Sequence, residues 1–158
     1  MREILFRGKR AGNGEWIFGS IVHQTDYYGD RCDRWFILEG DATNDYDIDY
    51  PIEVQKETVG QYTGLTDKNG VKIFEGDILQ GNEYPYYSDG KYNYYAEVVF
   101  FDDDCFAAGF CTHKNPKAKV KGISDGNCEL IEDFISDNWL VIGNIYDNPE
   151  LVEVIVNE

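Results

Sequence analysis

Residues 61–79 constrain the fold of this chain most, because turn-forming residues there alternate with short apolar runs. Residues 66–70 and 75–77 have the composition of tight turns, since Gly and Asn tolerate positive φ angles. Gly64 lies inside a β-prone run, where a glycine indicates a bulge or a close backbone contact. The stretch predicts a β-hairpin followed by another strand. We expect structural roles for Tyr62, Gly64, Gly70, Gly76 and Asp77.

The rest of the chain repeats this pattern of short β-prone runs between turns. Residues 128–137 place apolar side chains at a spacing compatible with a short helix, and residues 147–150 have the composition of a helix start. The sequence therefore predicts a mainly β fold with a short C-terminal helix. The predicted strands cover residues 4–6, 15–22, 34–38, 52–59, 61–65, 71–74, 94–101, 105–111 and 139–146.

The chain has 158 residues, enough for one domain or two small subdomains. Short strands divided by Gly, Asn and Asp favour small barrels, and a Gly-Asp-Ile turn leading into a strand is common in SH3-like barrels. We predict an N-terminal β subdomain over residues 1–58. It packs on a partly open SH3-like barrel over residues 59–158, which includes the C-terminal tail, in one compact unit.

The chain is strongly acidic, with a formal net charge of −16. Residues 122–158 contain no Lys or Arg, whereas residues 1–10 carry four basic side chains. Binding to nucleic acid requires clustered Lys and Arg, so we expect no direct contact with nucleic acid. The acidity serves solubility, or it provides an acidic face that imitates DNA.

No targeting or membrane segment is predicted. The N-terminus has an apolar run of only three residues, which is too short for a signal peptide. No run approaches the ~20 apolar residues of a membrane-spanning helix. We therefore expect a soluble cytoplasmic protein without a membrane partner, whose cysteines are reduced.

Three groups of side chains were weighed as metal sites. Residues 45–49 alternate Asp with other residues, but an EF-hand loop would need Gly and Glu where this chain has Tyr50 and Lys56. The three aspartates at 102–104 fit a hairpin turn better than a metal site. The third group consists of Cys and His side chains. Zinc accepts both ligand types, although the spacing of these residues matches no common zinc module. The candidates of that set are Cys105, Cys111, His113 and Cys128.

No catalytic pattern stands out. The two histidines are His23 and His113, and no Ser or Cys lies in a nucleophile-elbow pattern. Residues 12–14 form a turn, because the Lys-Ser/Thr of a phosphate-binding loop does not follow them. We expect no catalytic residue and no cofactor.

Six tyrosines gather in residues 84–95. Exposed Tyr is enriched at protein–protein contacts. Stacking on single-stranded bases would need a basic groove, and Lys91 is the one basic residue nearby. Packing in the core or loop is the structural alternative. We predict that the interaction residues are Tyr84, Tyr86 and Tyr87.

Three blocks of the chain resemble the YopX family of phage and prophage proteins. They are residues 6–10 with Trp16 and Gly19, residues 59–78, and residues 142–151. The resemblance implies a mostly β fold with an SH3-like part and a phage-encoded accessory role in the host cytoplasm. It implies no catalytic residues. We therefore expect contact with a protein partner or self-association. The alternatives are a DNA mimic that inhibits a host nucleic-acid-binding protein and a metal-dependent enzyme.

Overall fold

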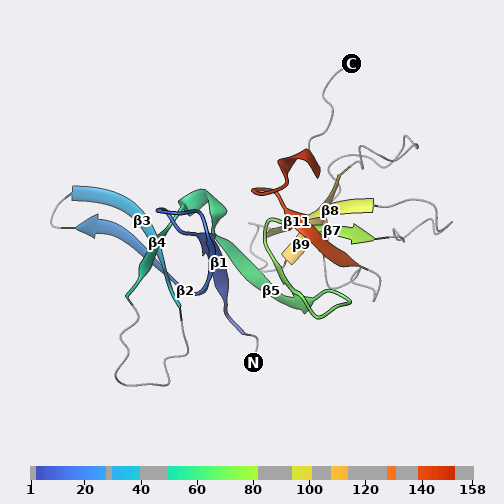
Figure 1. The fold of residues 1–158 in the computed structure, drawn as a ribbon, viewed down its shortest axis with the longest axis horizontal. Helices are drawn as coiled ribbons and strands as arrows, with labels where there is room; N and C mark the ends of the chain where they lie inside the picture. The colour runs from blue at the N-terminus through green and yellow to red at the C-terminus, as the bar shows by residue number, and fades with distance from the viewer. Residues whose placement is uncertain are drawn as a thin grey trace, which may run out of the picture. The chain divides into compact units, whose positions relative to one another are not determined.

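The chain is mainly β, as predicted (Figure 1). Helix in the described part of the computed structural model is limited to two 3-10 turns, η1 (Lys56–Thr58) and η3 (Pro149–Leu151). The chain divides into two compact units, residues 1–64 and residues 65–158. The structure describes residues 3–27, 30–39, 50–81, 94–100, 108–113, 128–130 and 139–151.

A six-stranded sheet has the order β4-β3-β2-β1-β5-β6. Its first four strands pair in antiparallel fashion. Strand β1 pairs with β2 across the turn at residues 10–14, so the turn predicted at residues 12–14 joins two antiparallel strands. The strands of this sheet are β1 (Phe6–Lys9), β2 (Trp16–Tyr27), β3 (Asp30–Leu38), β4 (Ile52–Val54), β5 (Gly60–Thr66) and β6 (Lys72–Phe74).

The core of the first unit forms on one face of β2, β3 and β4. Ile17, Ile37 and Val54 are its buried centre. This follows from strand periodicity, because alternate residues of a strand point to the same face. Four partly buried side chains pack around the centre and enlarge the core; they are Ile21, Trp35, Ile52 and Val59.

Strand β4 also bonds back to the end of β1. The Gln55 N–H donates to the Lys9 carbonyl at 2.8 Å, and the Ala11 N–H donates to the Glu53 carbonyl at 2.9 Å. These bonds curl the sheet around its core without closing it. The run at 52–59, predicted as one strand, is a strand only as far as Val54 and then turns through η1.

The second unit contains a five-stranded antiparallel sheet with the order β10-β9-β8-β7-β11. Its buried side chains include Ile78, Leu79 and Val98. Helical spacing at residues 128–137 was misleading where the structure describes it, because Cys128–Leu130 is a strand. The strands are β7 (Asp77–Gly81), β8 (Tyr94–Phe100), β9 (Ala108–His113), β10 (Cys128–Leu130) and β11 (Leu140–Asn144).

The predicted C-terminal helix is not confirmed. The helix-start composition at residues 147–150 gives the three-residue turn η3. Asn144 instead organises this segment, because its side-chain oxygen accepts bonds from the N–H groups of Tyr146 at 3.0 Å and Asp147 at 2.9 Å. Side-chain bonds of this kind stabilise a turn in competition with a helix.

Asp67 organises the central turn. Its carboxylate accepts three backbone N–H groups, those of Asn69 at 2.8 Å, Val71 at 2.9 Å and Val141 at 3.1 Å. Burial raises the pKa of Asp67, but these bonds outweigh burial and hold the pKa below its ordinary value. The side chain is 6% exposed, so the carboxylate serves as an internal anchor between the turn and β11.

Substitutions of Gly70 and Gly76 test the turn geometry, because the two are expected to destabilise the fold by different amounts. Both have a φ angle of 80°, in the left-handed region. A Cβ at Gly76 would also lie 3.1 Å from a ring carbon of Tyr146, whereas nothing lies within 4 Å at Gly70. We expect Gly70→Val to cost about 1–2 kcal/mol and Gly76→Val to cost more. Urea denaturation measures both, and equal midpoints for the two variants would contradict the turn geometry.

Candidate interaction site on the β2–β3 hairpin

The second part of β2, residues 20–27, pairs with another described strand on one side only. Residues 16–19 pair with β1, whereas residues 20–27 pair with β3. The two strands therefore run on together as a ribbon beyond β1 (Figure 1). The register shifts between Gln24 and Asp26, which marks a bulge with an extra residue in β3. Bulges turn side chains into new directions and are frequent next to functional sites.

Asp33, beside the bulge, gathers three polar partners on the core side of the ribbon. The His23 Nε2 atom lies 2.7 Å from its Oδ1, and the Trp35 Nε1–H donates to the same oxygen at 3.0 Å. The Lys56 Nζ group donates to the other oxygen, Oδ2. The His23 ring also stacks on Trp35, with 4.1 Å between ring centroids. The cluster thus ties the ribbon to η1.

The Asp33 cluster contains a His–Asp pair. Hydrogen bonds from Lys56, His23 and Trp35 lower the pKa of Asp33 to about 2. A carboxylate this acidic stays ionised near neutral pH, so it can hold the His23 ring in one orientation. In the described part of the chain no hydroxyl or thiol bonds to His23, and the nearby Cys32 thiol lies 3.7 Å from the Gln24 carbonyl, in position to donate to it.

The opposite face of the ribbon combines an aromatic ring with an ion pair. Arg34 donates to Glu53 in a bidentate manner, from Nε to Oε1 at 3.0 Å and from Nη2 to Oε2 at 2.5 Å. These bonds raise the pKa of Arg34 and lower that of Glu53. The Arg34 guanidinium also lies 5.0 Å from the ring centroid of Phe36. The pair holds the Phe36 ring at the surface.

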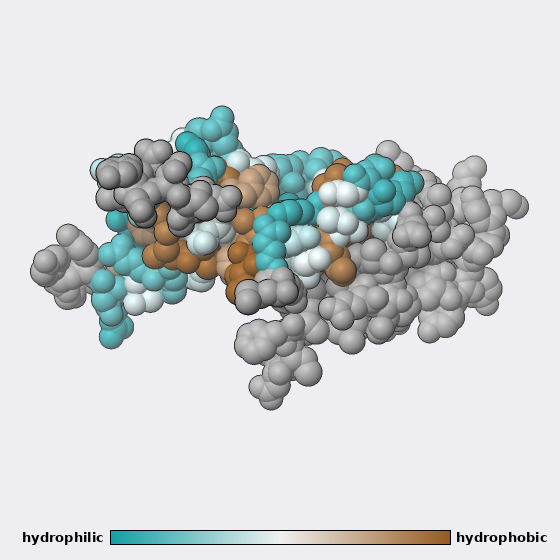
Figure 2. Space-filling model, turned by 90° about the horizontal axis from the view of Figure 1, so that it is seen from below, coloured by the Kyte–Doolittle hydropathy of each residue, from teal (hydrophilic) through white to brown (hydrophobic). Residues whose placement is uncertain are grey.

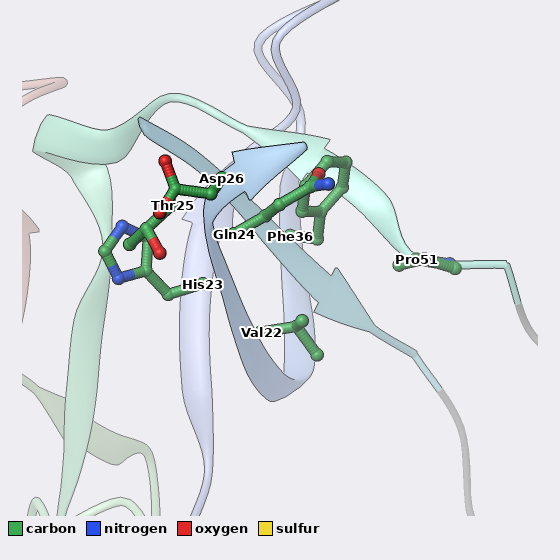
Figure 3. Close-up of a pocket in the computed structure, with 7 residues that line it drawn as sticks. All are labelled: Val22, His23, Gln24, Thr25, Asp26, Phe36 and Pro51. Atoms are coloured by element: carbon green, nitrogen blue, oxygen red, sulfur yellow. The ribbon is translucent and has the colours of Figure 1, made fainter. Parts of the chain in front are cut away.

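A hollow of about 460 Å³ opens along this part of the ribbon (Figure 3). Five consecutive residues of β2, 22–26, line it together with Phe36 and Pro51. The register pairs Val22 with Phe36, so both side chains lie on the same face. The hollow therefore has an apolar floor and a polar rim formed by Gln24, Thr25 and Asp26.

Hydrophobic surface is exposed among hydrophilic side chains of the first unit (Figure 2). Phe18 is 46% exposed and Val22 is 40% exposed. Exposed apolar side chains that gather beside polar ones mark contact surfaces more often than isolated ones do. We therefore take the hollow and its surroundings as the candidate interaction site.

The sequence singled out other residues as candidate sites. Tyr84, Tyr86, Tyr87 and Cys105 fall outside the described residues, as do residues 45–49 and 102–104. The backbone register pairs Cys111 of β9 with Cys128 of β10, and His113 is the last residue of β9. Within the described ranges no group of three or more His, Cys, Asp or Glu side chains is placed to hold a metal ion.

Sequence reasoning missed the Asp33 cluster and the hollow. His23 was noted only as one of two histidines, and Asp33 not at all. The members of the cluster come from β2, β3 and η1, so no local spacing links them. Trp35 opposite His23 would have been a signal, but reading it requires the register of the hairpin.

Residues 5–153 match the family described as YopX protein. The chain belongs to the YopX family. The match spans nearly the whole chain, so the family covers both units of this YopX chain. The resemblance carried by the three sequence blocks is confirmed.

Other comparisons of this YopX chain add little on function. It is similar to the crystal structure of protein EF1440 from Enterococcus faecalis, with 24% identity, coverage of 97% of this chain and 100% of that chain, and a TM-score of 0.47. Comparison with curated proteins gives no match. Among the described residues, no helix has the length and apolar character needed to span a membrane.

Proposed function

We propose that this YopX chain is a non-catalytic module that acts by binding another protein. The observation that carries the proposal is the open hollow on the β2–β3 ribbon, with the exposed Val22 and the Phe36 ring on its floor. A partner that covers this floor would stabilise the complex, because each Å² of apolar surface that is buried contributes about 25 cal/mol of free energy. The proposal includes a phage accessory role in the host cytoplasm, which the family resemblance supports.

The Asp33 cluster supports the shape of this binding surface. Its carboxylate accepts hydrogen bonds from His23, Trp35 and Lys56, so it links β2, β3 and η1. A rigid hairpin suits a binding surface, because less side-chain freedom is lost when a partner docks.

An SH3-like arrangement of the second unit is part of the proposal. Strands β7, β8, β9 and β10 follow one another in the sheet, and β11 returns to pair with β7. This return of the last strand to the first is the connection that a small five-stranded barrel needs. The Tyr-rich segment at residues 82–95 is a second contact surface in this proposal.

Affinity capture from host lysate, followed by direct binding to the purified partner, tests the function. We expect one stoichiometric protein partner, or an oligomer of the chain detected by light scattering. Failure to obtain either would contradict the proposal. A captured nucleic-acid-binding protein that DNA competes away would instead favour the DNA-mimic alternative.

A triple replacement, Tyr84, Tyr86 and Tyr87 to Ser, tests the Tyr-rich segment. We expect it to abolish capture or to split the oligomer while circular dichroism stays unchanged, because aromatic side chains carry much of the energy of an interface. Unchanged capture and unchanged oligomeric state would remove the Tyr-rich segment from the contact surface.

A further inference from the structure

We propose that the outer edge of β2, residues 20–27, binds an extended, positively charged segment of a partner protein as an added β-strand. This inference rests on the proposed function and specifies its contact surface and the chemistry of the ligand. Peptide addition to a sheet edge uses main-chain bonds for affinity and alternate side-chain pockets for specificity.

The backbone of β2 provides the edge. Within the described part of the chain, residues 20–27 pair with β3 on one side, and no strand pairs with them on the other. Every second residue of such a strand turns its N–H and C=O groups away from the existing partner. An edge of this kind is a template for another strand, and this one extends over eight residues.

The hollow lies on one face of the ribbon, next to the edge where an added strand would run. Its lining includes five consecutive residues of β2, 22–26. The lining also includes Phe36 of β3 and Pro51, so the hollow extends from β2 across the ribbon face that carries Val22 and Phe36. Val22 and Phe36 then offer an apolar position for one side chain of the ligand, next to the main-chain contacts (Figure 3).

The charge of the chain and of the hollow indicates which kind of peptide segment would bind to the β2 edge. Asp26 lies in the rim of the hollow, and it forms no ion pair with any described residue. The chain as a whole carries a net charge of −16, which repels nucleic acid and attracts basic segments. A Lys or Arg beside an apolar residue in an extended peptide would pair with Asp26 and cover Val22.

The Asp33 cluster keeps the edge in shape before binding. The stack of His23 on Trp35 and the contacts of Asp33 with Trp35 and Lys56 brace β2, β3 and η1 on the face opposite Phe36. A two-stranded ribbon is only marginally stable alone. Bracing it from one side leaves its outer edge available and reduces the entropy lost on binding.

A display library of random twelve-residue peptides, selected on the purified full chain, provides the probe. We expect enriched peptides that contain Lys or Arg, alternate with β-branched or aromatic residues, and lack internal Pro. Hydrogen exchange of the complex should protect the amides of residues 20–27. Enrichment of acidic peptides, enrichment of none, or protection confined to other segments would overturn the proposal.

Val22→Lys places a positive charge in the hollow and should weaken the selected peptides at least about tenfold, because like charges repel across a contact. Val71→Lys is the matched control, since Val71 is 48% exposed in the second unit and Val22 is 40% exposed. The control should bind as the wild type does. Equal binding by both variants would overturn the proposal.

The same variants separate this inference from the proposed function. If wild type and Val22→Lys capture the same partner from host lysate equally well, the proposed function stands and the β2 edge is not the contact. If no partner is captured and no peptide is selected, both the proposed function and the inference about the β2 edge are wrong. A dimer whose edge amides are protected would assign the edge to a second copy of the chain and overturn the peptide ligand.

Discussion

Asp67→Ala should lower the free energy of unfolding by about 3–4 kcal/mol, since hydrogen bonds to a charged group contribute about 1.5–3 kcal/mol each and are not fully additive. The substitution removes the acceptor for the N–H groups of Asn69, Val71 and Val141. Because Asp67 is buried, water reaches those N–H groups poorly once the carboxylate is gone.

Urea denaturation followed by circular dichroism measures this loss. Asp26→Ala is the matched control, because Asp26 is exposed and forms no side-chain bond with any described residue. We expect the control to stay within about 0.5 kcal/mol of wild type. Comparable losses in the two variants would show that the Asp67 bonds do not stabilise the turn.

The Asp67 carboxylate should also make stability depend on pH. Its pKa is lowered in the folded protein from an ordinary value of 3.8, since the three backbone bonds outweigh burial. The unfolded chain therefore binds the proton more readily than the folded one. The stabilisation is fully present above the unfolded pKa and is lost as the pH falls through the folded pKa. Asp67→Ala should show a shallower loss of stability in acid than wild type.

Gly19→Ala should disrupt the first unit, with a loss of more than about 3 kcal/mol, as for other substitutions that overpack a core. A Cβ at Gly19 would lie 1.8 Å from the Leu38 carbonyl oxygen and 2.6 Å from its carbon. These are backbone atoms of β3, which no rotamer change can move. The β2–β3 pairing starts next to this point, where Ser20 faces Leu38.

The stability of the Gly19→Ala variant can be measured by tryptophan emission in a denaturation series, because Trp16 and Trp35 both lie in the first unit. Gly12→Ala is the control, since a Cβ at Gly12 meets nothing within 4 Å. We expect the control to unfold as the wild type does. A Gly19→Ala protein as stable as the control would mean that β2 and β3 do not approach each other this closely.

The turns and the apolar strands were predictable because their signals are local. Asn69-Gly70 and Gly76 mark turns through backbone freedom, and the β-prone run at residues 15–22 marks the first part of β2. The outer ribbon was not predictable in the same way. Gln24, Thr25 and Asp26 are polar because both faces of the ribbon contact water, so they carry no alternation and were not included in a strand.

The candidate site was harder to predict than the fold. Its members are brought together by strand register and by the bulge between Gln24 and Asp26, and neither leaves a mark in local spacing. Of the residues 128–137, where the apolar spacing suits a helix, the structure describes residues 128–130. These three pair with β9 as a strand, so tertiary pairing overrides the local pattern there.

The bond from Val141 to Asp67 spans 74 residues, and it sets an order of events during translation. The strands of the first unit pair among themselves early in the chain, whereas the Asp67 carboxylate can meet the Val141 N–H only after β11 has been made. Domains made first generally fold first as synthesis proceeds. The β2 edge would therefore be present on the nascent chain before the second half is complete, so a partner could engage it while the ribosome is still adding residues.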